Sequence, residues 1–149
     1  MKQYVTPEQL QELTPEQQEA LRKWWKPEEW ELIYVTNKGL NTFGQAMRIT
    51  GINPACDSLP MRLYVDVGGW CLKSEVLPLL SIGQCIELLN NKTNEQSFGY
   101  NDSGCFWTVF MGNRGIGNMV EGSKGRQFSS YELVDALWIA VKELLQKPL

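Results

Sequence analysis

A glycine-rich and locally basic segment, residues 112–126, has the composition of an anion-binding loop. Its five glycines would let backbone amides approach a phosphate closely. Three basic residues stand against one acid, Glu121, which gives the segment a local charge of +2. The candidate ligand-binding residues in this segment are Asn113, Arg114, Gly115, Gly117, Lys124 and Arg126. A hairpin loop kept soluble by its charges is the simpler interpretation of the same residues.

The segment departs from the dinucleotide-binding fingerprint. Val120 stands where the third glycine belongs, after Gly115 and Gly117, and the segment does not lead straight into a helical pattern. A nucleotide site of another design needs aromatic rings that stack on the base, at roughly 1–3 kcal/mol per base. Trp70 and Trp107 are the candidate stacking residues, and Arg62 is a further candidate for the phosphate.

The six tryptophans also have a purely structural explanation, because a buried indole supplies a large apolar area. Trp138 lies on an apolar helical stripe and is expected in the core. Trp25 and Trp70 lie next to proline or glycine, where packing and ligand binding are equally compatible with the sequence.

The chain contains no histidine, which removes the Ser-His-Asp and Cys-His nucleophile systems and imidazole metal ligation. Catalysis by lysine or glutamate and metal sites built of carboxylates remain open. Asp66 is expected to be an outward-facing strand residue. The four cysteines lack CxxC spacing and are expected to be reduced and mostly buried. We therefore expect no catalytic residue, no metal site and no cofactor.

Charge is distributed unevenly along the chain. Residues 1–31 carry seven acids and four bases, whereas residues 32–149 carry ten of each. The balance argues against DNA binding, which requires a basic face. The acidic N-terminal region is either a docking surface for a basic partner or a solvated face. No secretory signal and no long apolar run are present, so we expect a cytoplasmic protein that does not bind membranes.

Helices are predicted at both ends of the chain. Thr6 and Thr14 are each followed by Pro-Glu-Gln, the capping-box pattern, which predicts helices over about 7–12 and 15–25. Ser81 begins a third helix that ends near Asn90. A stripe at helical spacing predicts a C-terminal helix from Ser130 to about Gln146.

Strands are predicted between these helices, over residues 30–35, 42–50, 62–67, 70–72 and 105–111. The last of these is apolar on both faces, which favours a central strand covered on both sides. Residues 51–60 and 90–104 are predicted to be loops. The fold class is therefore α+β over one domain, residues 1–149. We expect a mainly antiparallel sheet covered by the C-terminal helix, with two short N-terminal helices.

Three stretches resemble parts of small proteins from phages and prophages of Gram-positive bacteria: Leu13–Pro27, Leu77–Leu89 and Glu132–Leu145. Together they cover under a third of the chain and include no catalytic residue. The resemblance implies a setting in which small non-enzymatic proteins antagonise host immunity. They do so by binding a host defence protein or by sequestering a signalling nucleotide.

The leading functional hypothesis is thus a non-enzymatic phage-type binding protein that acts as a sponge for a cyclic nucleotide or an ADP-ribose-type signal. A protein-binding inhibitor of a host defence effector is the first alternative, and a histidine-free, metal-dependent nucleotide hydrolase is the second. A structural or regulatory phage protein unrelated to defence is a third. A homo-oligomer is compatible with each.

Overall fold

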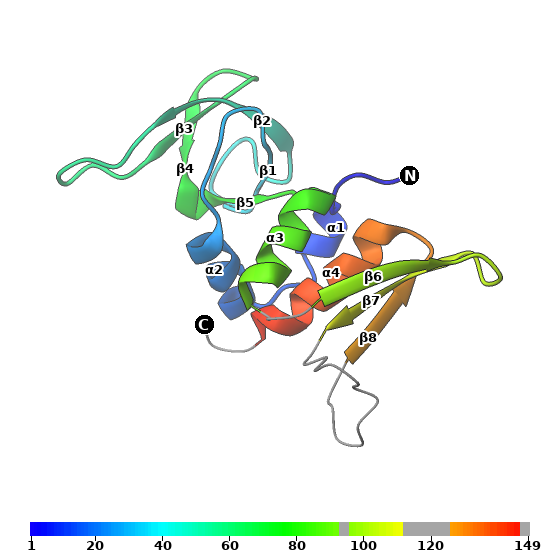
Figure 1. Ribbon diagram of the computed structural model, residues 1–149. Helices are drawn as coiled ribbons and strands as arrows, with labels where there is room; N and C mark the ends of the chain where they lie inside the picture. The colour runs from blue at the N-terminus through cyan, green and yellow to red at the C-terminus, as the bar shows by residue number, and fades with distance from the viewer. Residues whose placement is uncertain (93–95, 112–125, 147–149) are drawn as a thin grey trace. The chain divides into compact units, whose positions relative to one another are not determined.

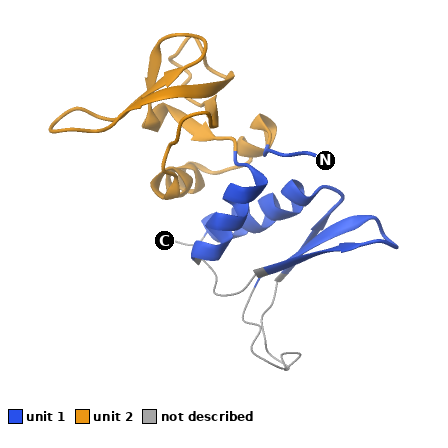
Figure 2. Cartoon of the chain, turned by 45° about the horizontal axis from the view of Figure 1, so that its top comes forward, with its two compact units in different colours: residues 1–5, 80–149 blue, residues 6–79 orange. Residues whose placement is uncertain are grey.

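The computed structural model describes residues 1–92, 96–111 and 126–146. These residues form two compact units, one made of residues 1–5 and 80–149 and the other of residues 6–79 (Figure 2). The described part holds four α-helices and two antiparallel sheets, which confirms the α+β class. The assignment of the whole chain to one domain stays a prediction.

The two N-terminal helices begin as the capping pattern predicted. α1 (Pro7–Leu10) follows Thr6, and α2 (Pro15–Trp24) follows Thr14. At each start the threonine hydroxyl accepts a hydrogen bond from the amide three residues on, and that glutamine's side chain accepts one from the threonine amide. These reciprocal bonds satisfy amides that a helix start otherwise leaves unpaired.

The second unit contains a five-stranded antiparallel sheet in the order β4-β3-β2-β1-β5 (Figure 1). The strands are β1 (Leu32–Val35), β2 (Ala46–Asn53), β3 (Arg62–Val65), β4 (Trp70–Leu72) and β5 (Val76–Pro78), with a 3-10 helix η1 (Lys73–Glu75) before β5. β2 lies further along the chain than predicted and takes in the first residues of the expected loop 51–60. The register shifts between Ile49 and Gly51, and this irregularity lets β2 continue alongside β3.

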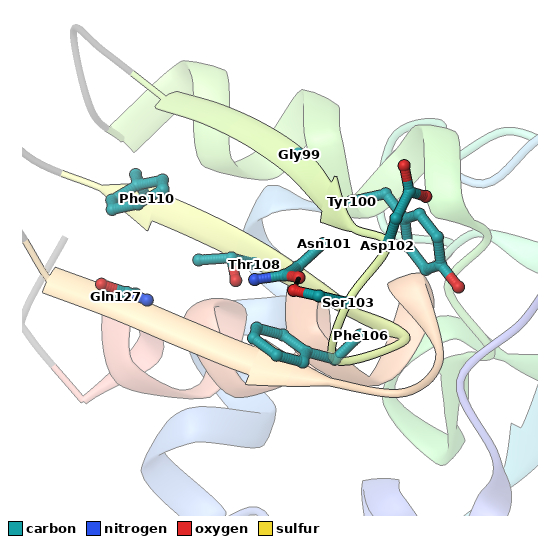
Figure 3. A pocket seen from close by; sticks show the side chains of 9 residues that line it. All are labelled: Gly99, Tyr100, Asn101, Asp102, Ser103, Phe106, Thr108, Phe110 and Gln127. Atoms are coloured by element: carbon teal, nitrogen blue, oxygen red, sulfur yellow. Dashed lines mark hydrogen bonds between the residues drawn. The ribbon is translucent and has the colours of Figure 1, made fainter.

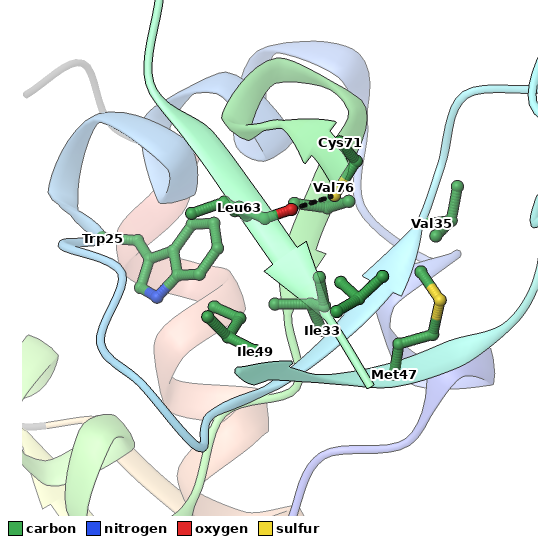
Figure 4. Close-up of a cluster of buried hydrophobic side chains, with 9 residues drawn as sticks. Trp25, Ile33, Val35, Met47, Ile49, Leu63, Cys71 and Val76 are labelled. Carbon is green, nitrogen blue, oxygen red and sulfur yellow. Dashed lines mark hydrogen bonds between the residues drawn. The ribbon is translucent and has the colours of Figure 1, made fainter. Parts of the chain in front are cut away.

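The core of this unit is an apolar cluster contributed by the strands and by Trp25 (Figure 4). Leu63 and Val65 of β3 point inward and are buried, whereas Tyr64 between them is exposed, as the alternating pattern predicted. Trp25 is only 1% exposed and its indole nitrogen donates to Glu31. The structure therefore assigns Trp25 to the core.

The first unit contains α3 (Ile82–Lys92), α4 (Leu133–Leu145) and a three-stranded antiparallel sheet. Its strands β6 (Gln96–Asn101), β7 (Phe106–Met111) and β8 (Arg126–Ser130) lie in the order β6-β7-β8. α4 packs against α3, β7 and β8, so the predicted cover of a sheet by the C-terminal helix is confirmed. The whole predicted stripe of α4 is buried, Trp138 included. The helix starts at Leu133 and not at the predicted Ser130, which is the last residue of β8.

The prediction of a loop over residues 90–104 is wrong. α3 continues to Lys92 and β6 occupies Gln96–Asn101, paired with β7 along its full length. Its sequence alternates the aromatic Phe98 and Tyr100 with the small or polar Ser97, Gly99 and Asn101, the period of a strand. The asparagine, serine and glycine content hid this alternation.

Candidate functional site

The two faces of β7 have different environments. Val109 and Met111 point toward the side on which α4 packs and are buried. Phe106 and Phe110 point to the opposite side and are only half-buried. The prediction that this strand is covered on both sides is therefore wrong, although its central position is confirmed. No helix or strand of the described residues packs on this side of β7, and an apolar strand face of this kind often marks a binding surface.

A hollow of about 630 Å³ lies over this open face (Figure 3). Phe106, Thr108 and Phe110 of β7 form its floor, with Gly99 and Asn101 from β6 on one side and Gln127 from β8 on the other. Tyr100 of β6 and the turn residues Asp102 and Ser103 complete the lining. All these residues belong to one compact unit.

Polar side chains around the two phenylalanines are held by local hydrogen bonds. The carboxamide oxygen of Asn101 accepts from the Ser103 hydroxyl at 2.8 Å and from the Gly104 amide at 3.0 Å. These bonds leave the amide nitrogen of Asn101 as a hydrogen-bond donor. The hydroxyls of Thr108 and Ser129 lie 3.1 Å apart across β7 and β8. The hollow thus combines apolar rings with fixed donors and acceptors.

Gly99 keeps the middle of the hollow open. It pairs with Thr108, and a Cβ atom placed on it would meet nothing within 4 Å. A larger residue here would extend into the space above the sheet. The absence of a side chain is therefore what leaves room for a ligand between Phe106 and Phe110.

Asp102 is the only charged residue among those that line the hollow in the described part of the chain. Next to it, the charge of Cys105 raises the pKa of the Tyr100 phenol above its ordinary value. The hollow is therefore suited to a neutral, planar group rather than to a phosphate.

The predicted stacking residues lie in different places. Trp107 is on β7 but points to the face opposite the hollow, where it contacts Tyr100 at 5.2 Å and Phe98 at 6.4 Å between ring centroids. Phe106 and Phe110 of the same strand, which the sequence did not single out, line the hollow instead. Side chains alternate along a strand, so adjacent aromatic residues serve opposite faces.

Arg62 and Trp70 belong to the other compact unit, and the structure brings these two together. The guanidinium of Arg62 stacks over the indole of Trp70, which is 51% exposed. Tyr64 pairs with Trp70 across β3 and β4 and is also exposed. Arg62, Tyr64 and Trp70 form an exposed surface that we call the Arg62–Trp70 surface.

The remaining predicted residues come from the glycine-rich segment. Asn113, Arg114, Gly115, Gly117 and Lys124 lie outside the described residues. Arg126 is the first residue of β8 and pairs with Met111. Anion binding by this segment therefore stays a prediction.

Acids and thiols in the described part of the chain form no group of three or more that could hold a metal ion. Asp66 is exposed and accepts a hydrogen bond from the Arg48 amide. It lies in the turn after β3, which ends at Val65, and not in the strand as expected. Among the described helices, none has the length and apolar content that a membrane span requires.

The sequence contains a pattern from which the hollow over β7 could have been predicted. The segment Phe106–Met111 is apolar on both faces, but α4 has only one apolar stripe to cover it. Comparison with known proteins does not add to this assignment: no family model, curated protein or solved structure matches the chain.

Proposed function

We propose that this chain is a non-enzymatic binding protein and that the hollow over β7 binds a ligand containing nucleobases. The observation that carries the proposal is the pair of half-buried rings, Phe106 and Phe110, on the open face of a central strand. Aromatic side chains on an open antiparallel sheet stack well on unpaired bases. The amide and hydroxyl groups of Asn101, Thr108 and Gln127 would bond the base edges.

The spacing of the two rings favours a ligand with more than one base. Phe106 and Phe110 are four residues apart on one strand, which places them roughly 14 Å from each other at about 3.4 Å per residue. One base cannot stack on both. A dinucleotide, a cyclic oligonucleotide or a short single strand could place one base on each ring, over the space that Gly99 leaves open.

The physiological role we propose is sequestration of a signalling nucleotide, in a phage-type protein that antagonises host immunity. The resemblance of three segments to small phage proteins supports this setting. The composition of the hollow supports binding without turnover, because Asp102 is the only carboxylate among its described lining residues. Phosphate contacts would come from Arg114 and Lys124, as the sequence predicts.

Calorimetry with cyclic di- and trinucleotides, ADP-ribose and short oligonucleotides tests the proposal. We expect Phe106→Ala and Phe110→Ala each to weaken binding by roughly five- to a hundredfold, the loss of one stacked base. Tyr64→Ala, which removes an exposed ring in the other unit, is the matched control and should leave affinity unchanged. Absence of binding across the panel, or an equal loss in the control, would refute the assignment.

The Arg62–Trp70 surface favours a second function, inhibition of a host defence protein by direct binding. Tryptophan, tyrosine and arginine dominate the binding energy of protein interfaces, and here all three lie together and partly exposed. Affinity capture of host proteins with the wild type and with Trp70→Ala tests this function. A partner lost only in the variant would support it, whereas a partner retained by both would contradict it.

A further inference from the structure

β6 is an edge strand whose outer side has no pairing partner in the described residues. All six of its residues pair with β7 on the inner side, from Gln96 opposite Met111 to Asn101 opposite Phe106. It is the first strand in the order β6-β7-β8 and forms the border of the sheet in Figure 1. Its outward backbone amides and carbonyls are therefore open to another strand.

Protein sheets usually protect such an edge, and β6 lacks the usual protection. The strand Gln-Ser-Phe-Gly-Tyr-Asn has neither a charged residue nor a proline. The other sheet edges differ: β4 and β5 have three residues each, β5 ends in Pro78, and β8 begins with Arg126. β6 is thus the longest edge strand described, and it is uncharged.

Two exposed aromatic side chains lie along this edge. Phe98 and Tyr100 are 45% and 49% exposed, and both contact Trp107 on the side of the sheet where α4 packs. α4 packs against β7 and β8, so these rings project beyond its cover. A partner strand at this edge would both hydrogen-bond the backbone groups of β6 and bury its apolar rings. Two independent features of β6 therefore favour a partner strand.

We propose that β6 pairs in antiparallel orientation with β6 of a second copy of this chain, forming a six-stranded sheet across a two-fold axis. A second copy fits because antiparallel pairing of one strand with itself is self-complementary. The lack of charge matters here, since any charge near the axis would face its own copy.

Six facing residues would supply about six backbone hydrogen bonds. The axis would also bring two Phe98–Tyr100–Trp107 clusters together.

The two-fold axis would stand perpendicular to the sheet, so the open faces of both copies would lie on the same side. The two β7 strands would be three strand spacings apart, roughly 14 Å. The two hollows would then form one symmetric surface suited to a two-fold symmetric ligand. This consequence rests on the proposed function, whereas the pairing of the β6 strands does not.

Sedimentation equilibrium of the ligand-free protein under reducing conditions tests the pairing. We expect a monomer–dimer equilibrium in the wild type. The double variant Phe98→Lys/Tyr100→Lys, which places like charges near the axis, should weaken dimerisation at least tenfold. Tyr131→Lys exchanges an even more exposed ring for lysine outside the edge and should dimerise as the wild type does. A monomeric wild type, or a double variant that still dimerises normally, would overturn the proposal.

Hydrogen exchange of the wild-type protein provides a second test. It uses no variant, so misfolding of a variant cannot affect the result. Amides of residues 97–101 that face outward should gain protection as protein concentration rises, while those of β4 should not. Protection independent of concentration would also overturn the proposal. Nucleotide binding plays no part in either measurement, so failure of the pairing and failure of the proposed function are separable.

Discussion

The guanidinium carbon of Arg62 lies 4.6 Å from the centroid of the Trp70 ring. The two residues are eight positions apart in the sequence, and the tight turn through Gly68 and Gly69, both with positive φ, brings their strands together. The contact holds the arginine side chain against the sheet while Trp70 stays half exposed. Stacking of this kind at an exposed site is worth about 0.5–1 kcal/mol.

A double-mutant cycle should detect this contact. We expect Arg62→Ala and Trp70→Ala each to lower the free energy of unfolding by about 1 kcal/mol or less, as is usual at exposed sites. Their coupling energy should be about 0.5–1 kcal/mol. Urea denaturation of the four proteins gives the measurement. Strictly additive effects would mean that the two side chains do not interact in solution.

A larger side chain at Gly99 should fill the hollow and lower the affinity for a ligand without lowering the stability of the fold. We expect Gly99→Val to abolish or strongly weaken the nucleotide binding that we propose, because its side chain would project into the space above β7. Stability should stay the same or rise, since a Cβ atom at this position meets nothing within 4 Å and valine favours strands. Calorimetry and thermal unfolding of the same sample measure both effects. Unchanged affinity would place the ligand elsewhere.

The α4 helix carries the core of its unit, so truncation there should be costly. We expect Leu137→Ala and Trp138→Ala to lower the free energy of unfolding by roughly 2–5 kcal/mol. Trp138→Phe should cost much less, within about 1 kcal/mol, because the buried indole N–H has no hydrogen-bond partner in the described structure. A cost for Trp138→Phe as large as for Trp138→Ala would indicate that the indole nitrogen has a partner in solution.

The four thiols should differ sharply in reactivity. Cys56 and Cys105 are exposed, whereas Cys71 and Cys85 are buried, so the expectation of mostly buried thiols holds for only two of the four. Burial raises the pKa of Cys85 to about 12, and burial together with the charge of Glu75 raises that of Cys71 to about 11. Alkylation of the native protein at neutral pH should label two thiols rapidly, and the denatured protein should show four.

The same two thiols predict a loss of stability in alkali. Their ionisation is easier in the unfolded chain, where a thiol titrates near pH 8.5. The stability they contribute is therefore fully present below that pH and is lost as the pH rises toward about 11 and 12. The double variant Cys71→Ala/Cys85→Ala should flatten the decline in urea midpoints above pH 9. An identical decline in the variant would assign the effect to other groups.

Local signals in the sequence were sufficient for the helices and for much of the first sheet. The Thr-Pro-Glu-Gln repeats fixed the starts of α1 and α2, since a capping box depends only on residues within four positions of each other. The alternation around Tyr64 likewise predicted which side chains of β3 are buried. β6 was missed because loop-forming residues outweighed a short alternation that has meaning only beside β7.

The sequence by itself determines the residue types, the net charge, the absence of histidine and the periodicity of each element. These properties depend only on composition or on neighbours along the chain. Which aromatic rings share a surface was decided by the tertiary structure. Strand pairing brought Arg62 to Trp70. The apolar stripe of α4 buried Val109 and Met111, whereas Phe106 and Phe110 on the other face are only half-buried. Such choices depend on contacts between residues far apart in the chain, which no local pattern records.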